Sequence, residues 1–463
     1  MQRVPATSQI TWRKAEMRRR LVIIALPWMR KHDDLAPLGH ASLVAALRLC
    51  TNVDVRQVIN PVNHDGFSLD GLVAGVLAEL EGIPQEHVDI GIGAYVWNDE
   101  YVKYLLRSLR SHGFQGRIIM GGPQVSYAGA GIDHIYPEAD VFVRGHAELA
   151  LCALVQARGR PRIKGIHYSG EDDLCEQAET DMVRLPSPWL NGTIQLGKQS
   201  SVHWETQRGC NFHCSFCQHR QPNAHTIVSR MSNSRVEDEI DLFCDVGVKR
   251  ISVLDPIFNS DPVRAPHILQ QFAQRGFQGE LSLQCRLEMV DDRFLEAAKT
   301  LNVSLEFGLQ SIHKREYLAV GRPNNMRKVE QTLQKVRRAN IRHEVSLIYG
   351  LPEQTLESFE SSVDWCLRQR IPVIKAFPLL LLRGTELEAK RDDWSFMTME
   401  GRVPIVVSAR SFSRMEWQEM ERIASALAQT EGNHPDCLRA LMSLSGRADY
   451  PSNVSQLRAL GKA

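Results

Sequence analysis

Short apolar runs alternate with amphipathic stretches over the first 150 residues. Five runs have the length and composition of strands, and they cover residues 21–26, 53–59, 88–96, 117–120 and 140–143. Helical patterns lie between them, for example over residues 40–49 and 101–111. Strand after helix after strand predicts right-handed crossovers and a parallel sheet with helices on both faces. We therefore expect an N-terminal extension over residues 1–20 and a Rossmann-like, doubly wound domain of five strands over residues 21–157.

The next stretch has no helical period. Residues 158–200 carry repeated proline and glycine, which predicts a linker with a small hairpin. The alternation then resumes with six strand-like segments at 201–206, 250–254, 281–285, 303–307, 344–348 and 373–382. Helical segments separate all six. This rhythm predicts a partial (β/α)6 barrel of the TIM type over residues 201–388, followed by a small C-terminal cap over residues 389–463.

Composition and charge limit the possible partners. The 463 residues are 43% hydrophobic and 24% charged, which is typical of a globular protein. Lys and Arg total 55 against 54 Asp and Glu, so no long-range field attracts nucleic acid or an acidic membrane. No apolar run near the N-terminus approaches the roughly 20 residues of a membrane span, and no secretory cleavage pattern follows it. Seven of the ten cysteines are isolated, so we expect a cytoplasmic protein with reduced thiols.

The other three cysteines form a compact cluster directly after the first barrel strand. Cys210, Cys214 and Cys217 follow the spacing C-x3-C-x2-C. A structural zinc normally takes four protein ligands, and only His213 and His219 stand nearby, so zinc is kept as an alternative. Three thiolates on a 4Fe-4S cluster instead leave one iron open for a substrate or cofactor.

These residues resemble the radical S-adenosylmethionine (radical SAM) superfamily, whose CxxxCxxC motif has an aromatic residue before its last cysteine, here Phe216. The resemblance covers both large domains. It implies an enzyme in which SAM chelates the open iron, and a reducing donor such as flavodoxin or ferredoxin supplies the electron that cleaves SAM. The resulting 5′-deoxyadenosyl radical abstracts hydrogen from an unactivated carbon.

The same resemblance implies SAM contacts at the carboxyl ends of the barrel strands. Two of these strand-end segments are close to the family's sequence pattern. After the second strand, however, residues 255–259 stand where the family usually has Gly-Gly-Glu. Taken singly, each position also suits a surface or capping role. The implied SAM contacts, besides Phe216, are Asp255, Asn259, Arg286, Glu306, Gln310, Ser311, Ile348 and Gly350.

Three loops of the N-terminal domain lie on the edge where doubly wound sheets bind ligands. They follow the third, fourth and fifth strands, and glycines in them let backbone amides approach a ligand closely. They look like the cobalamin-binding domain that precedes many radical SAM barrels, although His146 and Ala147 depart from its second glycine loop. The implied cobalamin contacts are Tyr95, Trp97, Gly121, Gly122, Pro123, Ser126, Gly145 and Glu148.

No Asp-x-His-x-x-Gly motif follows the first strand, so the resemblance implies base-off cobalamin without a histidine ligand. Trp28 and Trp97 either shield the lower face of the corrin or serve as packing residues. A domain that keeps this fold but has lost cobalamin is a further alternative.

With both cofactors, the resemblance favours a C-methyltransferase acting on an unactivated carbon of a small-molecule or peptide natural product. One alternative is a cobalamin-dependent radical SAM enzyme that performs cyclisation, rearrangement or oxidation without methyl transfer. Another is a non-catalytic cobalamin or iron–sulfur sensor. Methylthiotransferases resemble the chain less, because Cys50, Cys152 and Cys175 do not stand where their second cluster needs ligands. The sequence carries no code for the substrate.

Overall fold

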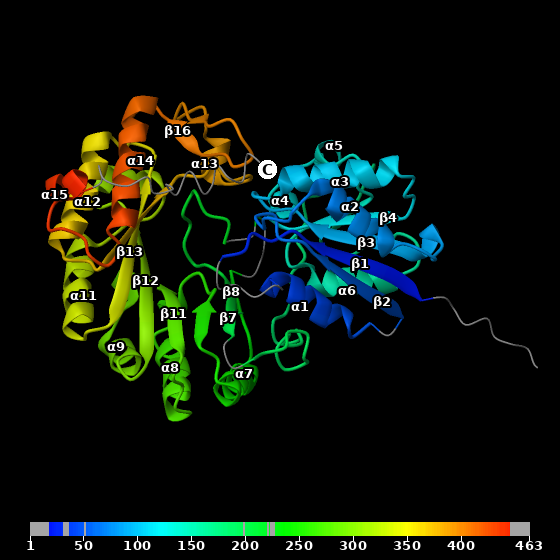
Figure 1. Cartoon of the computed structure of the whole chain (residues 1–463), viewed down its shortest axis with the longest axis horizontal. Helices are drawn as coiled ribbons and strands as arrows, with labels where there is room; N and C mark the ends of the chain where they lie inside the picture. The colour runs from blue at the N-terminus through cyan, green and yellow to red at the C-terminus, as the bar shows by residue number, and fades with distance from the viewer. Residues whose placement is uncertain are drawn as a thin grey trace, which may run out of the picture.

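The computed structural model describes residues 18–30, 37–50, 52–197, 200–219, 222 and 227–444. Most of the expected N-terminal extension and the last part of the expected C-terminal segment lie outside these ranges. The described residues form two α/β bodies that lie side by side (Figure 1). Over these ranges, no helix has both the length and the apolar character required to cross a bilayer.

The N-terminal body is built on a mostly parallel sheet with the strand order β2-β1-β3-β4-β5-β6. Its first five strands follow the expected runs closely. Successive strands are added on one side of β1 up to β2 and on the other side from β3 onward, so the strand order reverses between β1 and β3. The strands are β1 (Arg19–Ala25), β2 (Val53–Ile59), β3 (Val88–Gly93), β4 (Arg117–Gly121), β5 (Val141–Val143) and β6 (Ile166–Tyr168). This is the flavodoxin-like order, in which the reversal opens a ligand crevice at the carboxyl ends of β1 and β3.

Helices cover both faces of this sheet, as a doubly wound fold requires. Helices α1 (Leu38–Leu47) and α6 (Ala147–Gln156) pack together on one face, and α2 (Leu69–Ala78) and α3 (Asp99–Ser111) pack together on the other. Each face has its own apolar core. The short helices α4 (Pro123–Ser126) and α5 (Ile132–Ile135) follow β4.

The expectation of five strands for this sheet is wrong by one strand. Residues 166–168, expected in the linker, form β6, which pairs antiparallel with β5. Three residues are too short for a periodic pattern, and their pairing depends on the β5 edge that only the folded sheet provides. The linker therefore closes one edge of the sheet.

The second body is a partial barrel of six parallel strands in the order β14-β13-β12-β11-β10-β7. The strands agree with the six expected segments, and all neighbouring pairs are parallel. They are β7 (Ser201–Trp204), β10 (Arg250–Val253), β11 (Glu280–Cys285), β12 (Asn302–Gln310), β13 (Arg342–Tyr349) and β14 (Val373–Pro378). The fold class expected from the sequence is thus confirmed.

Strict alternation along these strands separates a packed outer face from a polar lumen. In β12, Leu305, Phe307 and Leu309 are buried in the barrel core, whereas the alternate positions Glu306 and Gln310 line the interior cavity. The same alternation places Ser252 beside Ser282, and Ser282 beside Ser304, on adjacent strands. Bulky branched residues fill the interior of a closed TIM barrel. Small and polar residues leave this lumen open.

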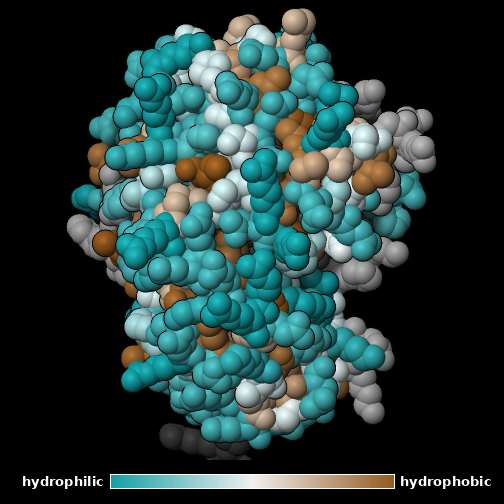
Figure 2. All heavy atoms as spheres, turned by 90° about the vertical axis from the view of Figure 1, so that its left-hand side faces the viewer, coloured by the Kyte–Doolittle hydropathy of each residue, from teal (hydrophilic) through white to brown (hydrophobic). Residues whose placement is uncertain are grey.

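Amphipathic helices form the outer layer of the barrel. They are α7 (Asn233–Val246), α8 (Arg264–Gln274), α9 (Asp292–Ala298), α11 (Met326–Arg338), α12 (Leu356–Arg368) and α14 (Arg414–Gln429). The barrel face turned away from the N-terminal body is largely hydrophilic, with separate apolar spots (Figure 2). Helix α14, expected in the C-terminal cap, packs on β14 and α12. The expected boundary at residue 388 stays a prediction.

Candidate active site

The cysteine loop begins at a sharp corner after β7. Strands β8 (Gln207–Gly209) and β9 (Val228–Arg230) pair antiparallel and close the base of the loop. Gly209 has φ of +91°, and a Cβ at this position would collide with the carbonyl oxygen of Ile227. Only glycine allows this pairing directly before Cys210.

Two later segments of the barrel contact the backbone of the cysteine loop. The amide of Ser215 donates to the carbonyl of Val320 at 3.0 Å, and the amide of Leu387 donates to the carbonyl of Ser215 at 3.0 Å. Gly321 approaches so closely that a Cβ there would lie 2.7 Å from the carbonyl oxygen of His213. Protein contacts from two other segments therefore hold the backbone of His213 and Ser215, which flank Cys214.

All three cysteines line one cavity, together with Phe216. Burial raises the pKa of the Cys210 thiol, and it raises that of Cys217 to about 11. Both thiols are thus protonated near neutral pH in the free chain, and metal binding would displace their protons. Within the described ranges, no three His, Cys, Asp or Glu side chains are placed to hold a single ion in common, as a mononuclear zinc site requires.

Two buried guanidinium groups flank the cysteine loop. Arg322 places Nη1 3.6 Å from the sulfur of Cys214. Arg286, one of the expected SAM contacts, lies with its guanidinium carbon 4.1 Å from the centre of the Phe212 ring, and its Nη2 donates to the carbonyl of Pro323 at 2.5 Å. Arg322 and Arg286 therefore bring positive charge to the place where three thiolates would gather.

The cavity occupies about 710 Å³ of the barrel lumen. The expected SAM contacts Glu306 and Gln310 line it, as does Arg322. Gln310 has φ of +70°, a left-handed conformation that side chains rarely adopt, and a register shift in the sheet accompanies it. Gln310 Oε1 and Arg322 Nε are buried and have no hydrogen-bond partner among the described residues, so the wall presents an acceptor and a donor to a polar ligand.

Carboxylates are concentrated deeper in the same lumen. Glu306 accepts a hydrogen bond from the hydroxyl of Ser282, and Glu344 forms an ion pair with Lys375 at 2.6 Å. Burial raises the pKa of Glu344, and the nearby carboxylates of Glu306 and Glu431 raise it further, against the opposing effect of Lys375. This part of the lumen suits a polar ligand.

Asp255 and Asn259 stand behind the cavity wall. Asp255 is fully buried and accepts hydrogen bonds from the amides of Thr206 at 2.7 Å and Gln207 at 3.1 Å. Asn259 bonds both backbone polar groups of Arg286, at 2.9 and 3.0 Å. Neither Asp255 nor Asn259 is among the described residues that line the cavity. Both position the strand ends around the cysteine loop, and their assignment as SAM contacts stays a prediction.

Ser311, Ile348 and Gly350 meet in a second buried network. Ser311 donates to Glu316 at 2.6 Å, and Gln354 Nε2 donates to the carbonyl of Ile348 at 3.1 Å. Gln354 Oε1 accepts from the amide of Gly350 at 2.7 Å. This network joins the ends of β12 and β13 but does not reach the described cavity lining. Its three expected SAM contacts also stay predictions.

The glycine loops of the N-terminal body are held by protein contacts. A Cβ at Gly122, with φ of +87°, would lie 2.6 Å from the carbonyl oxygen of Ala94, so this glycine permits close packing on the loop after β3. Pro123 opens α4, and the carbonyl of Gly121 accepts from the amide of Ala94 at 2.8 Å. Ser126 accepts from the amide of Gly145 at 2.9 Å, which joins the two loops.

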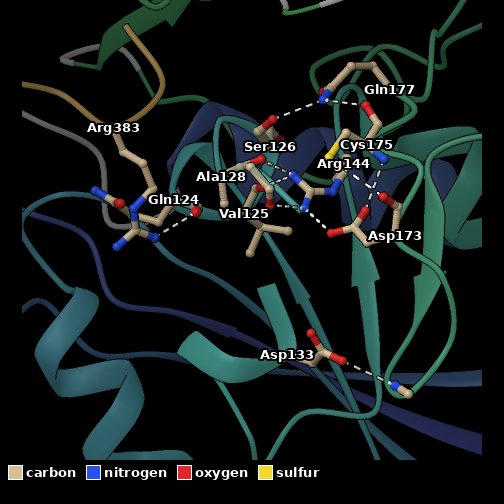
Figure 3. A network of polar contacts seen from close by, with 12 residues as sticks. Gln124, Val125, Ser126, Ala128, Asp133, Arg144, Asp173, Cys175, Gln177 and Arg383 are labelled. Atoms are coloured by element: carbon tan, nitrogen blue, oxygen red, sulfur yellow. Dashed lines mark hydrogen bonds and ion pairs between the residues drawn. The ribbon is translucent and has the colours of Figure 1, made fainter. Parts of the chain in front are cut away.

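Arg144 and Arg383 donate hydrogen bonds to α4 and the residues after it from opposite sides (Figure 3). Arg144 donates to the carbonyls of Val125 at 2.7 Å and Ala128 at 2.6 Å, and it forms a buried ion pair with Asp173 at 2.6 Å. Arg383, from the barrel, donates to the carbonyl of Gln124 at 2.8 Å. The loop is thus fixed jointly by both bodies.

The remaining expected cobalamin contacts lie at the junction between the two bodies. Tyr95 stacks on Trp97 with ring centroids 4.6 Å apart, and Trp97 Nε1 donates to the carbonyl of Leu26 at 3.2 Å. Trp28 and Trp97 pack against the barrel core and against the core on the α2/α3 face of the N-terminal sheet. Glu148 is buried in an ion pair with Arg208. These contacts give each side chain a structural role, and the cobalamin assignments stay predictions.

The donor sets fit the three expected cofactors to different degrees. Three thiols at one cavity wall, flanked by two guanidinium groups, fit an iron–sulfur cluster. The adjoining lumen, with its unpartnered amide oxygen and guanidinium N–H, fits SAM. For cobalamin, the fit rests on the loops at the carboxyl edge of the N-terminal sheet. Tyr127, which follows β4 and α4 at this edge, donates a hydrogen bond to the carbonyl of Gln218 in the cysteine loop.

Sequence reasoning missed several residues of this site. Arg322 and Gly321 follow a short helix, α10 (Lys314–Ala319), in a segment with no recognisable motif. Lys375 and Glu344 could have been found, because each occupies a polar position in an otherwise apolar alternating strand. Arg208 stands two residues before Cys210, but its partner Glu148 is 60 residues earlier in the chain.

Comparison with known proteins agrees with this geometry. Residues 204–366 match the family model described as the radical SAM superfamily. The chain is 26% identical over 323 residues to the cobalamin-dependent radical SAM methyltransferase TokK of Streptomyces tokunonensis, a match that covers 63% of this chain and 46% of TokK. It is also 26% identical over 322 residues to the 2-(S-pantetheinyl)-carbapenam-3-carboxylate methyltransferase of Streptantibioticus cattleyicolor, with the same coverage. The chain thus spans about half the length of these two relatives.

A solved structure has the same fold over almost the whole chain. The radical SAM methyltransferase TsrM from Kitasatospora setae, with tryptophan substrate and a SAM analogue bound, superposes with a TM-score of 0.68 at 16% identity. The superposition covers 92% of this chain and 96% of TsrM. A second TsrM structure, with cobalamin and a [4Fe-4S] cluster bound, gives a TM-score of 0.64 at 17% identity over 87% of this chain and 82% of TsrM.

Proposed function

Because residues 204–366 match the radical SAM superfamily, we propose that this chain is a cobalamin-dependent radical SAM methyltransferase. Its acceptor is an unactivated carbon of a small-molecule or peptide natural product. One observation carries the proposal: Cys210, Cys214 and Cys217 line a polar lumen of about 710 Å³, and Arg30, which follows β1 of the N-terminal sheet, lines the same lumen. A cluster at one wall and a carrier at the facing edge would enclose a substrate between them.

The bound cofactors supply one-electron cleavage of SAM, hydrogen abstraction and a methyl carrier. The chain's own residues provide position and shelter. Cys210, Cys214 and Cys217 hold the cluster, and Phe216, Glu306 and Gln310 border the adjoining space. A reducing donor such as flavodoxin or ferredoxin delivers the electron. The curated relatives TokK and the carbapenam methyltransferase support methyl transfer, since their names state that activity.

The lumen supports a polar substrate. Serines on adjacent strands offer hydroxyl groups, and Glu344 with Lys375 offers one charge of each sign. Such groups fix the orientation of a small molecule, so that one of its carbon–hydrogen bonds faces the cluster side of the cavity. The hydrogen bond from Arg383 to the carbonyl of Gln124 in α4 joins the two bodies beside the lumen.

The test is anaerobic reconstitution of the full chain with iron, sulfide and hydroxocobalamin. We would count iron, record the retained corrin absorbance, and assay 5′-deoxyadenosine and S-adenosylhomocysteine after adding SAM and a reductant. Wild type is compared with a Cys210→Ala, Cys214→Ala, Cys217→Ala triple variant. Cys244→Ala, on the outer helix α7, is the matched control.

We expect about four irons, retained corrin, and both products in wild type and the control. The triple variant should lose the iron and the deoxyadenosine. Deoxyadenosine without S-adenosylhomocysteine would favour the alternative of cyclisation, rearrangement or oxidation. A cluster and corrin without either product would favour a sensor. Zinc in place of iron would refute the proposal.

A further inference from the structure

Two helices near the cysteine loop begin with pairs of exposed basic residues. Lys314 and Arg315 stand in the first turn of α10, and Arg327 and Lys328 stand in the first turn of α11. Within the described ranges, none of these four side chains takes part in an ion pair. The whole chain has a formal charge of only +1, so this local excess of positive charge does not follow from composition.

Helix stability does not explain these basic residues. The first turn of a helix carries a partial positive charge, so cations there are unfavourable. The first turn of α11 holds no acidic residue, and Glu288, which reaches the start of α11, is paired with Arg286 at 3.3 Å. In α10, the acidic residue of the first turn, Glu316, is buried and accepts hydrogen bonds from Ser311 and Gln354. Both carboxylates are therefore engaged inside the protein.

The two basic pairs lie close together. Asn324 Nδ2 donates to the carbonyls of Leu309 and Ser311, both at 3.0 Å. Asn324 directly precedes the N-cap of α11, and Ser311 stands two residues before the N-cap of α10. The first turns of the two helices are thus held side by side. Their exposed cations form one surface, which we call the basic patch: Lys314, Arg315, Arg327 and Lys328.

An exposed apolar side chain adjoins the basic patch. Leu318 follows Lys314 by one helical turn, so both lie on the same face of α10. Leu318 is 51% exposed, and Gly321, whose amide donates to the carbonyl of Leu318 at 3.0 Å, is exposed as well. Apolar contact surrounded by charge is the usual composition of a protein interface.

This surface lies directly over the cysteine loop. A Cβ on Gly321 would come 2.7 Å from the carbonyl oxygen of His213, and the carbonyl of Val320 accepts from the amide of Ser215 at 3.0 Å. His213 and Ser215 are the two neighbours of Cys214 in the chain. A partner seated on the exposed backbone of Gly321 would therefore be separated from this cysteine by little more than main-chain atoms.

We propose that the basic patch and Leu318 form the docking surface for an acidic one-electron carrier protein that reduces the cluster. The proposal rests on the cluster of the proposed function, but not on methyl transfer. Opposite charge draws the acidic face of the carrier to the patch and speeds association, and contact with Leu318 brings its redox group to the cysteine loop. The carrier then loses one electron and the cluster gains it, while no covalent bond forms or breaks.

The experiment measures 5′-deoxyadenosine formation by the reconstituted full-length protein with two electron sources. Reduced flavodoxin, an acidic protein, has to dock, whereas excess dithionite is small and needs no docking surface. Wild type is compared with an Arg315→Glu, Lys328→Glu double variant, which places a favourable acidic residue in each first turn and should therefore fold. The matched control is Lys249→Glu, Arg338→Glu, which changes the charge equally at exposed positions near the amino ends of the barrel strands.

With reduced flavodoxin, we expect the second-order rate of deoxyadenosine formation to fall at least about tenfold in the double variant, while the control matches wild type. Raising the ionic strength from about 0.05 M to about 0.5 M should lower the wild-type rate toward that of the double variant. With dithionite, all three proteins should agree. Binding of oxidised flavodoxin, measured by calorimetry without SAM, should weaken at least about tenfold in the double variant alone.

A double variant that binds flavodoxin and uses its electrons as well as wild type does would overturn the proposal. Equal losses with flavodoxin and dithionite would also overturn it, because Arg315 and Lys328 would then support the cluster loop itself. An equal loss in the control would do the same, because net charge alone would explain it. Failure of the proposed function appears separately, in wild type with dithionite, as absence of deoxyadenosine or of S-adenosylhomocysteine, and calorimetry still tests the docking surface in that case.

Discussion

Glu148 forms an ion pair with Arg208, with 2.7 Å between Oε1 and Nη2. Glu148 belongs to the second glycine loop of the N-terminal body, and Arg208 precedes the first cluster cysteine by two residues. Glu205 contacts the same guanidinium at 2.9 Å. Both sides of the Glu148–Arg208 pair are nearly buried, so this contact ties the N-terminal sheet to the cysteine loop.

Replacing Glu148 should loosen this tie. Among the described residues, Glu148→Gln leaves Arg208 with Glu205 as its carboxylate partner, and we expect a loss of about 1–3 kcal/mol in the free energy of unfolding. Chemical denaturation measures this loss, and iron retention after reconstitution should fall with it. The control is Glu171→Gln, because its ion pair with Arg160 is exposed and should contribute less than about 1 kcal/mol. Equal losses in both variants would contradict the coupling.

Asp255 should make stability depend on pH. Burial raises the pKa of Asp255 to about 6, against its ordinary value near 4. The folded state thus binds a proton that the unfolded state releases, so this contribution is fully present below pH 4 and is lost as the pH rises through 6. Relative to Asp255→Asn, wild type should lose up to about 3 kcal/mol between pH 4 and pH 7. Urea denaturation at several pH values measures the difference, and parallel curves for the two proteins would refute the assignment.

Gly321 should tolerate no side chain. It has φ of +63°, and a Cβ would lie 2.7 Å from the carbonyl oxygen of His213 in the cysteine loop. Gly276→Ala is a matched control, since Gly276 has φ of +69° but open space around its Cβ position. Both alanine variants should lose about 1 kcal/mol from backbone strain. Only Gly321→Ala should also lose iron, as counted after reconstitution, and unchanged iron would show that the loop can shift without cost.

Asp173 should be necessary for the glycine loop after β4. Its partner Arg144 is fully buried and holds the carbonyls of Val125 and Ala128. Asp173→Asn leaves that charge without a carboxylate, which costs about 3–5 kcal/mol when a buried pair is broken. We expect this loss in thermal or chemical unfolding, together with weaker retention of corrin absorbance. Glu296→Gln, which breaks an exposed pair, should leave both properties unchanged.

The strands of both bodies could be predicted from the sequence because they are buried on one or both faces. In β12, Leu305, Phe307 and Leu309 alternate with polar residues, and this period of two has few other interpretations. Three-residue strands such as β6 carry no such period. Such a strand forms only where another strand offers a free edge for pairing, here β5, and the residues of β6 themselves do not reveal that edge.

In the candidate site too, some residues could be recognised from a local pattern, whereas others are brought in only by the fold. The spacing of Cys210, Cys214 and Cys217 is local, so it could be recognised in one loop of sequence. Arg322 contacts Cys214 from a position 108 residues later in the chain, and Glu148 contacts Arg208 from 60 residues earlier. Asp255 and Asn259 stood at the expected strand end, but the direction of a side chain at a strand end depends on the turn that follows.

By itself, the sequence determined the two α/β bodies, most of their strands and the three cysteines of the cluster loop, because hydrophobic period and motif spacing are properties of neighbouring residues. Only the tertiary structure decided which polar side chains face the lumen and which are consumed in protein contacts. It also placed the guanidinium of Arg322 at Cys214. These outcomes depend on distances between segments far apart in the chain, and such distances are set by the packing of the whole fold rather than by any local pattern.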